Sequence, residues 1–436
     1  MPFASVLNIE PDGPNAADPI PPNFRPTDKT ELPELLDAVQ WSHGSYFWSG
    51  ADADSGLPFD RLHVRDGASS DLISIGGVGF GLLAIVVMAS RGWLPRSEAA
   101  RRVDRTIASL ERVPRFKGAF PHFVRRDFSV VPLVPCDDGG DLVETALLAQ
   151  GLICAREFFS FDEPEEIGVR VGVNRIVGLI EWANYVRPDA RRSLYWHWSP
   201  KHFWTLNTPI TGWNEALVAY VLAAGSEAFP IDREVFRVGW ANEGNHRNGT
   251  DYYGHRLPAG VPFGGPLFLS QYSFCALDPR SLRDNDIQYW DQAVAHSRIN
   301  FEHCRRNPNG HFGYGTYGWG LTASDGPKGY LVSCPVNDHG VLAPTAALSS
   351  FPFVPQESEM ALRSFLRYGN GRLWTEFGFV DSFAPSQNWV SEWRLAINQG
   401  PVVAMIENFR SGLLWRLFMN APEIKRGLDR LSVNTQ

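Results

Sequence analysis

A tryptophan, an asparagine and a glutamate stand together where an apolar helical pattern begins. They are Trp213, Asn214 and Glu215 in the stretch NTPITGWNEALVAYVLAAGS, residues 207–226. A glutamate in the first turn of a helix is usually explained by the positive end of the helix dipole. In a cleft, however, an adjacent indole would desolvate the carboxylate and raise its pKa, which suits a general acid near neutral pH. Trp213 could then stack on a sugar ring, and Asn214 could bind a sugar hydroxyl.

A second stretch gathers four carboxylates within a few residues. In PCDDGGDLVETALLAQGL these are Asp137, Asp138, Asp141 and Glu144. Their spacing predicts that Asp137, Asp141 and Glu144 share one face at a helix start. Capping a helix needs only one or two acids, whereas carboxylates held close together repel one another and titrate as a coupled set with a raised pKa. We therefore expect a functional cleft here.

Asp381 stands between Phe379 and Phe383 in the loop EFGFVDSFAPSQNW, which glycine and proline bound. An acid among aromatic residues is harder to explain as solvated surface than an isolated acid. Trp389, at the end of the same loop, supplies an indole that could contact a sugar. We therefore regard Asp381 as a candidate catalytic residue and Trp389 as a candidate substrate contact.

A further loop-rich stretch, GWGLTASDGPKGYLVSCPVNDHG, contains Trp319, Asp325 and His339. All three could line a cleft, because glycine and proline interrupt any regular element around them. His339 could equally be a structural partner at the start of a following helix. We expect these residues among the substrate contacts.

The composition favours a soluble globular protein whose partner is a neutral small molecule or polymer. The chain has 436 residues, a net charge of −8 and no long basic run, which argues against nucleic acid and anionic membranes as partners and weakly against polyanionic glycans. Fifteen tryptophans, many beside glycine, asparagine or aspartate, either pack under loops or stack on sugar rings.

No cofactor or metal is expected. The five cysteines are scattered without a CxxC pair, and no stretch has the spacing of a zinc or calcium site. A nucleophile elbow and a P-loop are also missing from the sequence. Carboxylates and aromatic residues therefore remain as the groups that could perform chemistry.

Helical patterns recur along the chain with long aromatic and glycine-rich loops between them, which predicts an all-α protein. Their pairing suggests a toroid of inner and outer helices, with the loops gathered at one end as a cleft. LFLSQYSF is a minor strand-like piece. The helices are expected at 30–48, 74–93, 95–113, 141–159, 165–186, 214–226, 288–305, 337–350, 356–370, 389–397, 401–417 and 421–430.

The first 33 residues are rich in proline and polar residues, and we expect an extended arm across the outside of a single domain at 34–436. No basic region followed by an apolar run appears at the N-terminus. As written, the chain would be cytoplasmic; it would be periplasmic or secreted if a signal was removed. GVGFGLLAIVVMAS, its longest apolar stretch, is too short to span a membrane.

Several long motifs, in order, resemble the bacterial glucoamylase-like family that includes the endo-β-1,2-glucanases of glycoside hydrolase family 144. The resemblance runs from about Trp41 to about Phe418. It is carried by SIGGVGFGLLAIVVMASRGWLPRSEAARRV, DDGGDLVETALLAQGL, GWNEALVAYVLAAG, TASDGP, APTAALSSFPFVP and AINQGPVVAMIENFRSGLLW.

The resemblance implies an (α/α)6 barrel that hydrolyses β-1,2-glucan with inversion and without a metal. The catalytic acid of the family maps onto Glu215 in the NEAL segment. Acids of the DDGGD segment, Asp137, Asp138 and Asp141, are implied in the cleft, and we place the base on Asp381. The expected substrate is a neutral glucan oligo- or polysaccharide, bound by a monomer.

Other functions stay open on the sequence. An exo-acting, sophorose-releasing β-1,2-glucan hydrolase or an α-glucan hydrolase could share this fold. A polysaccharide lyase would act on an anionic substrate, which the net charge of −8 disfavours. A glycan-binding protein without catalysis would not need Glu215 or the DDGGDLVET run.

Overall fold

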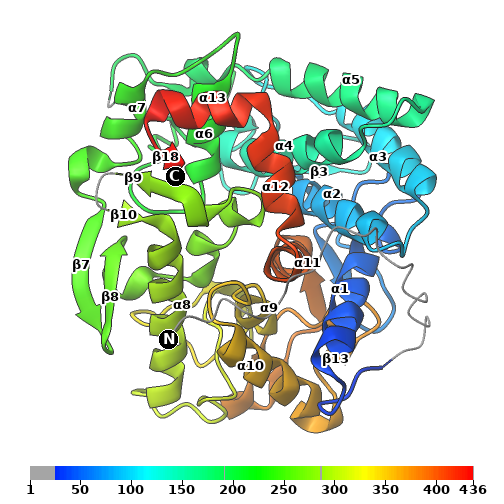
Figure 1. Cartoon of the computed structure of the whole chain (residues 1–436), viewed down its shortest axis with the longest axis vertical. Helices are drawn as coiled ribbons and strands as arrows, with labels where there is room; N and C mark the ends of the chain where they lie inside the picture. Colours follow the sequence, from blue (N-terminus) through cyan, green and yellow to red (C-terminus); the bar gives the residue numbers. More distant parts are fainter. Residues whose placement is uncertain (1–24, 191, 285–286, 436) are drawn as a thin grey trace.

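The computed structural model describes residues 25–190, 192–284 and 287–435, and it is dominated by helices (Figure 1). The α-helices in these ranges are α1 Leu32–Trp48, α2 Ile75–Ser90, α3 Arg96–Leu110, α4 Leu142–Phe158, α5 Pro164–Gly178, α6 Leu217–Gly225, α7 Arg233–Val238, α8 Tyr289–Arg306, α9 Pro344–Leu348, α10 Pro355–Arg367, α11 Ala396–Arg410, α12 Leu413–Asn420 and α13 Pro422–Leu431.

Short strands lie in the loops between these helices and pair into ribbons of two or three strands. Five ribbons carry residues of the site described below, namely β1–β17, β2–β3–β4, β5–β6, β11–β12 and β15–β16. The strands are β1 Arg61–His63, β2 Leu72–Ser74, β3 Phe123–Arg125, β4 Val130–Val131, β5 Gly140–Asp141, β6 His197–Trp198, β7 Arg247–Tyr252, β8 His255–Ala259, β9 Leu282–Asp284, β10 Ile287–Gln288, β11 Ala323–Gly326, β12 Gly329–Val332, β13 Trp374–Thr375, β14 Gly378–Phe379, β15 Phe383–Ala384, β16 Trp389–Val390, β17 Trp393–Leu395 and β18 Asn434–Thr435.

Helices α2, α4, α6 and α11 form the interior and are buried on nearly every face, mostly through apolar side chains. Helix α2 packs against α4 and α11, while α13 lies across α6 (Figure 1). The amphipathic helices α3, α10 and α13 bury only one face each. Two large clusters of buried apolar side chains result, and α1 and α11 contribute to both.

Glycines allow α2 and α4 to touch through their backbones. A Cβ added at Gly79 would lie 2.1 Å from the carbonyl oxygen of Leu147, and one at Gly151 would lie 2.1 Å from the carbonyl oxygen of Gly79. No side chain fits there. The close approach also brings the backbone N–H of Gly76, in the first turn of α2, within 2.6 Å of the Glu144 carboxylate on α4.

Most of the expected long helices are confirmed, but several local predictions are wrong. The segment 389–397 forms β16 and β17 before α11 begins, and only the end of 337–350 is helical, as α9. LFLSQYSF forms 3₁₀ turns, Leu267–Ser270 and Ser273–Cys275, instead of a strand. These errors fall on short segments, where apolar content alone does not distinguish the two structures.

The expected N-terminal arm lies mostly outside the described residues, which begin at Arg25. The Arg25 guanidinium donates to the carbonyl oxygen of Gly371 at 2.9 Å. On α10, Arg363 donates to the backbone oxygens of Asp28 and Thr30 at 2.8 and 2.9 Å. Residues 25–30 therefore pack beside α10, and α1 follows from Leu32. Within the described ranges, none of the helices has both the length and the apolarity that a membrane span requires.

Candidate active site

Two neighbouring cavities open among the short ribbons. The first, which we call the acidic cavity, has a volume of about 440 Å³ and is lined by three carboxylates, those of Asp60, Glu144 and Glu215. The second, which we call the tryptophan cavity, has a volume of about 330 Å³ and is lined by Trp389 and Trp393. Arg61 and Tyr330 line both.

Glu215 reaches the acidic cavity from the loop that precedes α6. The sequence placed it in the first helical turn, but α6 begins only at Leu217. The Asn214 side chain accepts a hydrogen bond from the Ala216 N–H at 2.9 Å, and the Ser273 hydroxyl donates to the Glu215 carbonyl oxygen. These bonds fix the backbone so that the carboxyl group faces the cavity.

Burial raises the pKa of Glu215 to about 7, and the negative charges of Asp141 and Glu144 add to this effect. A carboxyl group with such a pKa is protonated in a large fraction of molecules near neutral pH. Glu215 therefore has the raised pKa that is expected of a general acid. The cause of this shift is burial of the carboxyl group in the cavity wall and not an exposed neighbouring indole.

A stability measurement should reveal this buried carboxyl group. Between about pH 4.5 and pH 7 the unfolded chain releases a proton that folded Glu215 retains, so the parent loses stability as pH rises through this window. We expect Glu215→Gln to be more stable than the parent at pH 8, on the order of 1–2 kcal/mol after solvent screening, and equal to it at pH 4. Thermal or urea unfolding at both pH values tests this, and a variant that is less stable at pH 8 would contradict it.

The substrate contacts expected of Trp213 and Asn214 are corrected by the structure. Trp213 is only 5% exposed, packs against Trp240 and Tyr289, and donates its indole N–H to the Ser270 hydroxyl at 3.1 Å. Asn214 uses its side chain within its own loop and does not line the acidic cavity. Both residues pack or form hydrogen bonds within the protein near Glu215, and neither forms a surface on which a sugar could stack.

Asp141 is the N-cap of α4, and its two oxygens are fully engaged. It accepts from the N–H groups of Val143 and Glu144 at 3.0 and 2.9 Å, from His122 Nδ1 at 2.8 Å and from Trp196 Nε1 at 3.1 Å. The expected helical face from Asp137 to Glu144 is wrong, because the helix starts at Leu142. Asp141 therefore orients its neighbours and has no oxygen free for proton transfer.

Asp137 and Asp138 do not line the acidic cavity and instead bind neighbouring protein groups. Asp137 lies 3.1 Å from His197 Nε2 and accepts from the Leu133 N–H at 3.0 Å. Asp138 accepts from the Ser199 hydroxyl at 2.6 Å and pairs with Lys201 at 3.1 Å. The catalytic role expected of Asp138 and the substrate contact expected of Asp137 therefore stay predictions.

Glu144 is the member of this acidic group that reaches the cavity. Burial raises its pKa to about 7, despite the nearby charge of His122, whose Nε2 lies 4.0 Å from a Glu144 oxygen. Burial alone would lower the pKa of His122, but Glu144 and the hydrogen-bonded Asp141 outweigh it and raise the pKa to about 10. The charged form of His122 is thus favoured at neutral pH, and its ring faces the cavity beside Glu144.

Asp381 does not line a cavity itself, but it contacts Asn398, which contacts the wall of the acidic cavity. It is completely buried, accepts from Asn398 Nδ2 and from the Asp325 N–H at 2.7 Å each, and lines neither cavity. Burial raises its pKa to about 7, with a contribution from the charge of Asp325. Asn398 in turn accepts from the hydroxyl of Tyr272, which does line the acidic cavity.

Two of the remaining expected residues lie in the tryptophan cavity and two lie elsewhere. Asp325 and Trp389 line this cavity. Trp319 is completely buried, packs against Phe301 and donates to the Glu357 carbonyl oxygen at 3.1 Å. His339 is exposed and lines neither cavity. The complete burial of Trp319 therefore contradicts its expected substrate contact, whereas the contact expected of His339 stays a prediction.

The sequence reading missed Asp60, Arg61, His122 and Tyr272, all of which line the acidic cavity. Arg61 pairs with Asp325, 264 positions later in the chain. No local spacing could have revealed this contact. The sequence did contain a hint that His122 belongs to the site. In FPHFVRRDF it stands among aromatic residues, shortly before the acidic stretch.

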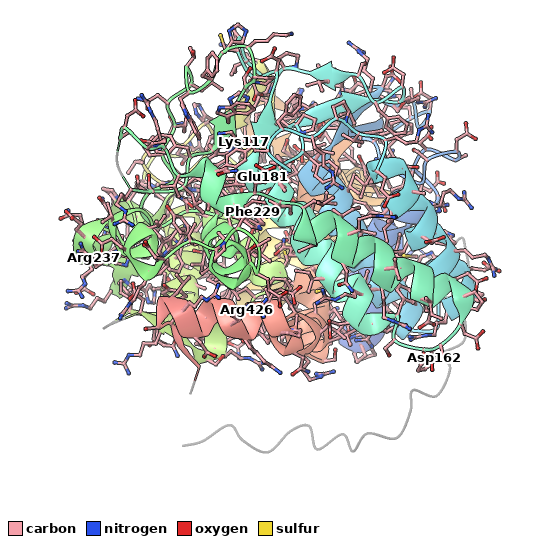
Figure 2. All side chains as sticks on the ribbon, turned by 90° about the horizontal axis from the view of Figure 1, so that it is seen from above. Lys117, Asp162, Glu181, Phe229, Arg237 and Arg426 are labelled. Atoms are coloured by element: carbon pink, nitrogen blue, oxygen red, sulfur yellow. The ribbon has the colours of Figure 1, made fainter. Side chains whose placement is uncertain are left out.

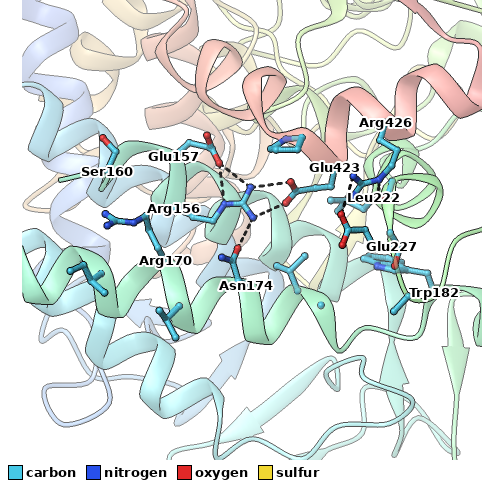
Figure 3. A pocket seen from close by; sticks show the side chains of 18 residues that line it. Arg156, Glu157, Ser160, Arg170, Asn174, Trp182, Leu222, Glu227, Glu423 and Arg426 are labelled. Carbon is cyan, nitrogen blue, oxygen red and sulfur yellow. Dashed lines mark hydrogen bonds and ion pairs between the residues drawn. The ribbon is translucent and has the colours of Figure 1, made fainter. Parts of the chain in front are cut away.

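A larger hollow of about 790 Å³ lies between α5 and α13 (Figure 3). Figure 2 looks onto this face, with Arg426 on α13 and Asp162 beside the start of α5. Arg156 is held there by Glu423 and Asn174 at 2.9 Å each. Its charged groups satisfy one another, and none of the expected site residues lines it. We therefore place the candidate site in the acidic cavity.

Comparisons with known proteins found a family model and several relatives that this chain resembles. A family model described as "Putative glucoamylase" matches residues 207–422. The exo β-1,2-glucooligosaccharide sophorohydrolase (non-reducing end) of Parabacteroides distasonis is 38% identical over 419 residues, which are 91% of this chain. The chain spans 58% of the length of that relative.

Two solved structures are similar over nearly all of this chain. The endo-β-1,2-glucanase of Chitinophaga pinensis, in complex with sophorotriose and glucose, is 38% identical with a TM-score of 0.89, covering 93% of this chain and 99% of that one. A β-1,2-glucanase from Parabacteroides distasonis is 37% identical with a TM-score of 0.88, covering 94% of this chain and 60% of that one.

Proposed function

Because the chain belongs to the glucoamylase-like family, we propose that it is a glycoside hydrolase that cleaves β-1,2-glucan. The family description alone would suggest starch, but a fold name does not fix a substrate. The names of the relatives at 38% identity specify β-1,2-linked glucan. The observation that carries the proposal is Glu215, a carboxyl group with a pKa of about 7 in the wall of the acidic cavity.

We assign the general acid to Glu215 and the general base to Asp381. Tyr272 supports this pair, because it lines the acidic cavity together with Glu215. Its hydroxyl donates at 3.1 Å to Asn398, whose amide group donates to Asp381. Inverting hydrolysis needs an acid and a base on opposite faces of the sugar, separated widely enough for a water molecule. In an unliganded site, catalytic contacts are often incomplete, so the burial of Asp381 does not exclude it.

The proton balance of the reaction follows from these roles. Glu215 protonates the glycosidic oxygen as the bond to the anomeric carbon breaks, while water attacks that carbon from the opposite face. Asp381 takes the proton that the water loses. The products are two sugar chains, one with an inverted anomeric centre, and both carboxyl groups then return to their starting states by exchange with solvent.

The other polar groups of the acidic cavity serve binding and orientation in this proposal. The imidazolium of His122 and the carboxyl group of Glu144 line the cavity and can form hydrogen bonds with sugar hydroxyls. Asp141 fixes His122 and the indole of Trp196, which also lines the cavity. In the tryptophan cavity, Asp325 and Trp389 are proposed substrate contacts.

We further propose that the helices form an (α/α)6 barrel in a single domain from residue 34 onwards, acting as a monomer. The alternation along the chain supports this arrangement. The interior helices α2, α4, α6, α9 and α11 are interleaved with helices that keep an exposed face, such as α3, α5 and α10.

A product profile on linear β-1,2-glucan, laminarin and starch tests the proposed function. Release of reducing sugar from β-1,2-glucan alone is expected. A ladder of oligosaccharides would indicate endo action, whereas sophorose as the sole early product would indicate exo action. Hydrolysis of starch in place of β-1,2-glucan would overturn the substrate assignment, and binding without release would indicate a glycan-binding protein. Unsaturated products detected by absorbance would indicate a lyase.

Removal of divalent metals should leave hydrolysis unchanged. The proposed mechanism uses two carboxyl groups and water, and no group of three or more potential ligands occurs in the part of the chain that the structure describes. Initial rates on β-1,2-glucan, measured before and after dialysis against EDTA, should agree within error. Strong loss of rate that zinc or calcium restores would contradict the assignment.

A further inference from the structure

The acidic and tryptophan cavities meet at two side chains. Arg61 and Tyr330 are the residues that line both of them. The Arg61 guanidinium lies 5.8 Å from the centre of the Tyr330 ring. A ligand that extends from one cavity into the other must therefore pass these two side chains.

Backbone pairing fixes both sides of this boundary. Tyr330 on β12 stands directly opposite Asp325 on β11, in a hairpin whose register ends at Gly326 and Gly329. Arg61 on β1 pairs with Leu395 on β17. The two ribbons hold the boundary residues on regular structure, so their positions do not depend on a long loop.

Arg61 also links one carboxylate from each cavity. Its Nη1 donates to Asp325 at 2.7 Å, and its Nε lies 3.4 Å from Asp60. Asp325 lines the tryptophan cavity and Asp60 the acidic cavity. This double pairing fixes the guanidinium at the boundary, and Tyr330, which is 52% exposed, offers the surface that a ligand would meet.

The tryptophan cavity has the chemistry of a neutral sugar site. The partly buried indoles of Trp389 and Trp393 offer flat apolar faces, and Asp325, Ser391 and Glu392 offer hydrogen-bond acceptors. Its one cationic lining residue, Arg61, is already paired with carboxylates. Stacking faces with acceptors around them suit a ring that carries several hydroxyl groups and no charge.

We propose that the tryptophan cavity binds further glucosyl units of the chain that is cleaved in the acidic cavity, with Tyr330 and Arg61 as the threshold between the two. This inference rests on the proposed function and deepens it. A chain that crosses the threshold contacts both cavities, whereas a short oligosaccharide fills only one. The specificity constant should therefore rise with chain length, and Tyr330 should determine that rise.

The test compares β-1,2-linked oligosaccharides from the trisaccharide to the heptasaccharide. In the parent, kcat/KM should increase with length by tenfold or more. We expect Tyr330→Ala and Trp389→Ala to lower the ratio of kcat/KM for the longest to the shortest substrate by about three- to tenfold, mainly through KM, as loss of one aromatic contact would. Tyr317→Ala is the matched control, since Tyr317 is 56% exposed and lines neither cavity.

Binding to the Glu215→Gln variant gives a second readout that needs no turnover. Calorimetry should show that adding Trp389→Ala weakens the heptasaccharide about three- to tenfold and leaves the trisaccharide almost unaffected, because Trp389 lines the tryptophan cavity and not the acidic cavity. Equal losses for both lengths, or a parent without length dependence, would overturn the inference while β-1,2-glucan hydrolysis stands. A parent that hydrolyses laminarin or starch instead would overturn the proposed function first.

Discussion

Glu215→Gln is expected to lower kcat on β-1,2-glucan by about 10²–10⁴-fold, the contribution typical of a general acid. Glutamine has the shape of glutamic acid and keeps the hydrogen-bonding capacity of its protonated form, but it cannot give a proton to the glycosidic oxygen. KM should change little, because substrate contacts from the rest of the acidic cavity remain. Initial rates over a range of substrate concentrations, with circular dichroism to check the fold, measure this effect.

Glu234→Gln is a suitable control for this substitution. Glu234 is on α7, where it pairs with Arg237 at 2.7 Å away from both cavities, so turnover should stay at the parental value. A Glu215→Gln enzyme with near-parental kcat would show that Glu215 only supports its loop. The acid would then have to be sought in the acidic stretch, first at Glu144, which faces the cavity, and then at Asp137 and Asp138.

The sequence predicts the interior of this protein well because interior helices leave a continuous signal. Helices α2 and α4 are apolar over several turns, and a strand of that length would be unusual. Asp141, followed three residues later by Glu144, marks the start of α4. The same stretch carries much of the family resemblance, so fold and family could be inferred together.

The details of the site depend on contacts that the sequence does not encode locally. Whether Trp213 faces a substrate or the core is decided by Ser270 and Tyr289, which come from later segments of the chain. An indole beside a glutamate fits both arrangements equally well. The two-residue strands of the ribbons are likewise below the length at which alternation of side chains can be recognised.

The shared pKa of about 7 at Glu215 and Asp381 determines the pH dependence of the reaction. The active form needs Glu215 protonated and Asp381 ionised. Activity should fall as pH rises through the pKa of Glu215, and it should also fall as pH decreases through the pKa of Asp381. Because burial raises both values to about 7, the profile of kcat/KM should be a narrow bell near neutral pH.

Asp381→Asn should lower kcat by about 10²–10⁴-fold and remove the acidic limb of this bell. Asparagine can still accept one of the two hydrogen bonds that Asp381 receives, so we expect the variant to fold. It cannot take a proton from water, and its residual rate should therefore stay level as pH falls from 7 to 5. The measurement is kcat/KM from pH 5 to pH 9, with thermal unfolding to check the fold.

Glu144→Gln separates the proposed base from the nearest alternative. Glu144 lines the acidic cavity and has a similarly raised pKa, but it accepts a hydrogen bond from the Gly76 N–H and lies beside the ring of His122, whose pKa is raised. Both contacts suit an acceptor for sugar hydroxyls, so its removal should raise KM and preserve the acidic limb. If that limb disappears in Glu144→Gln and persists in Asp381→Asn, the base is Glu144, and Asp381 serves only to hold Asp325 and Asn398 behind the cavity wall.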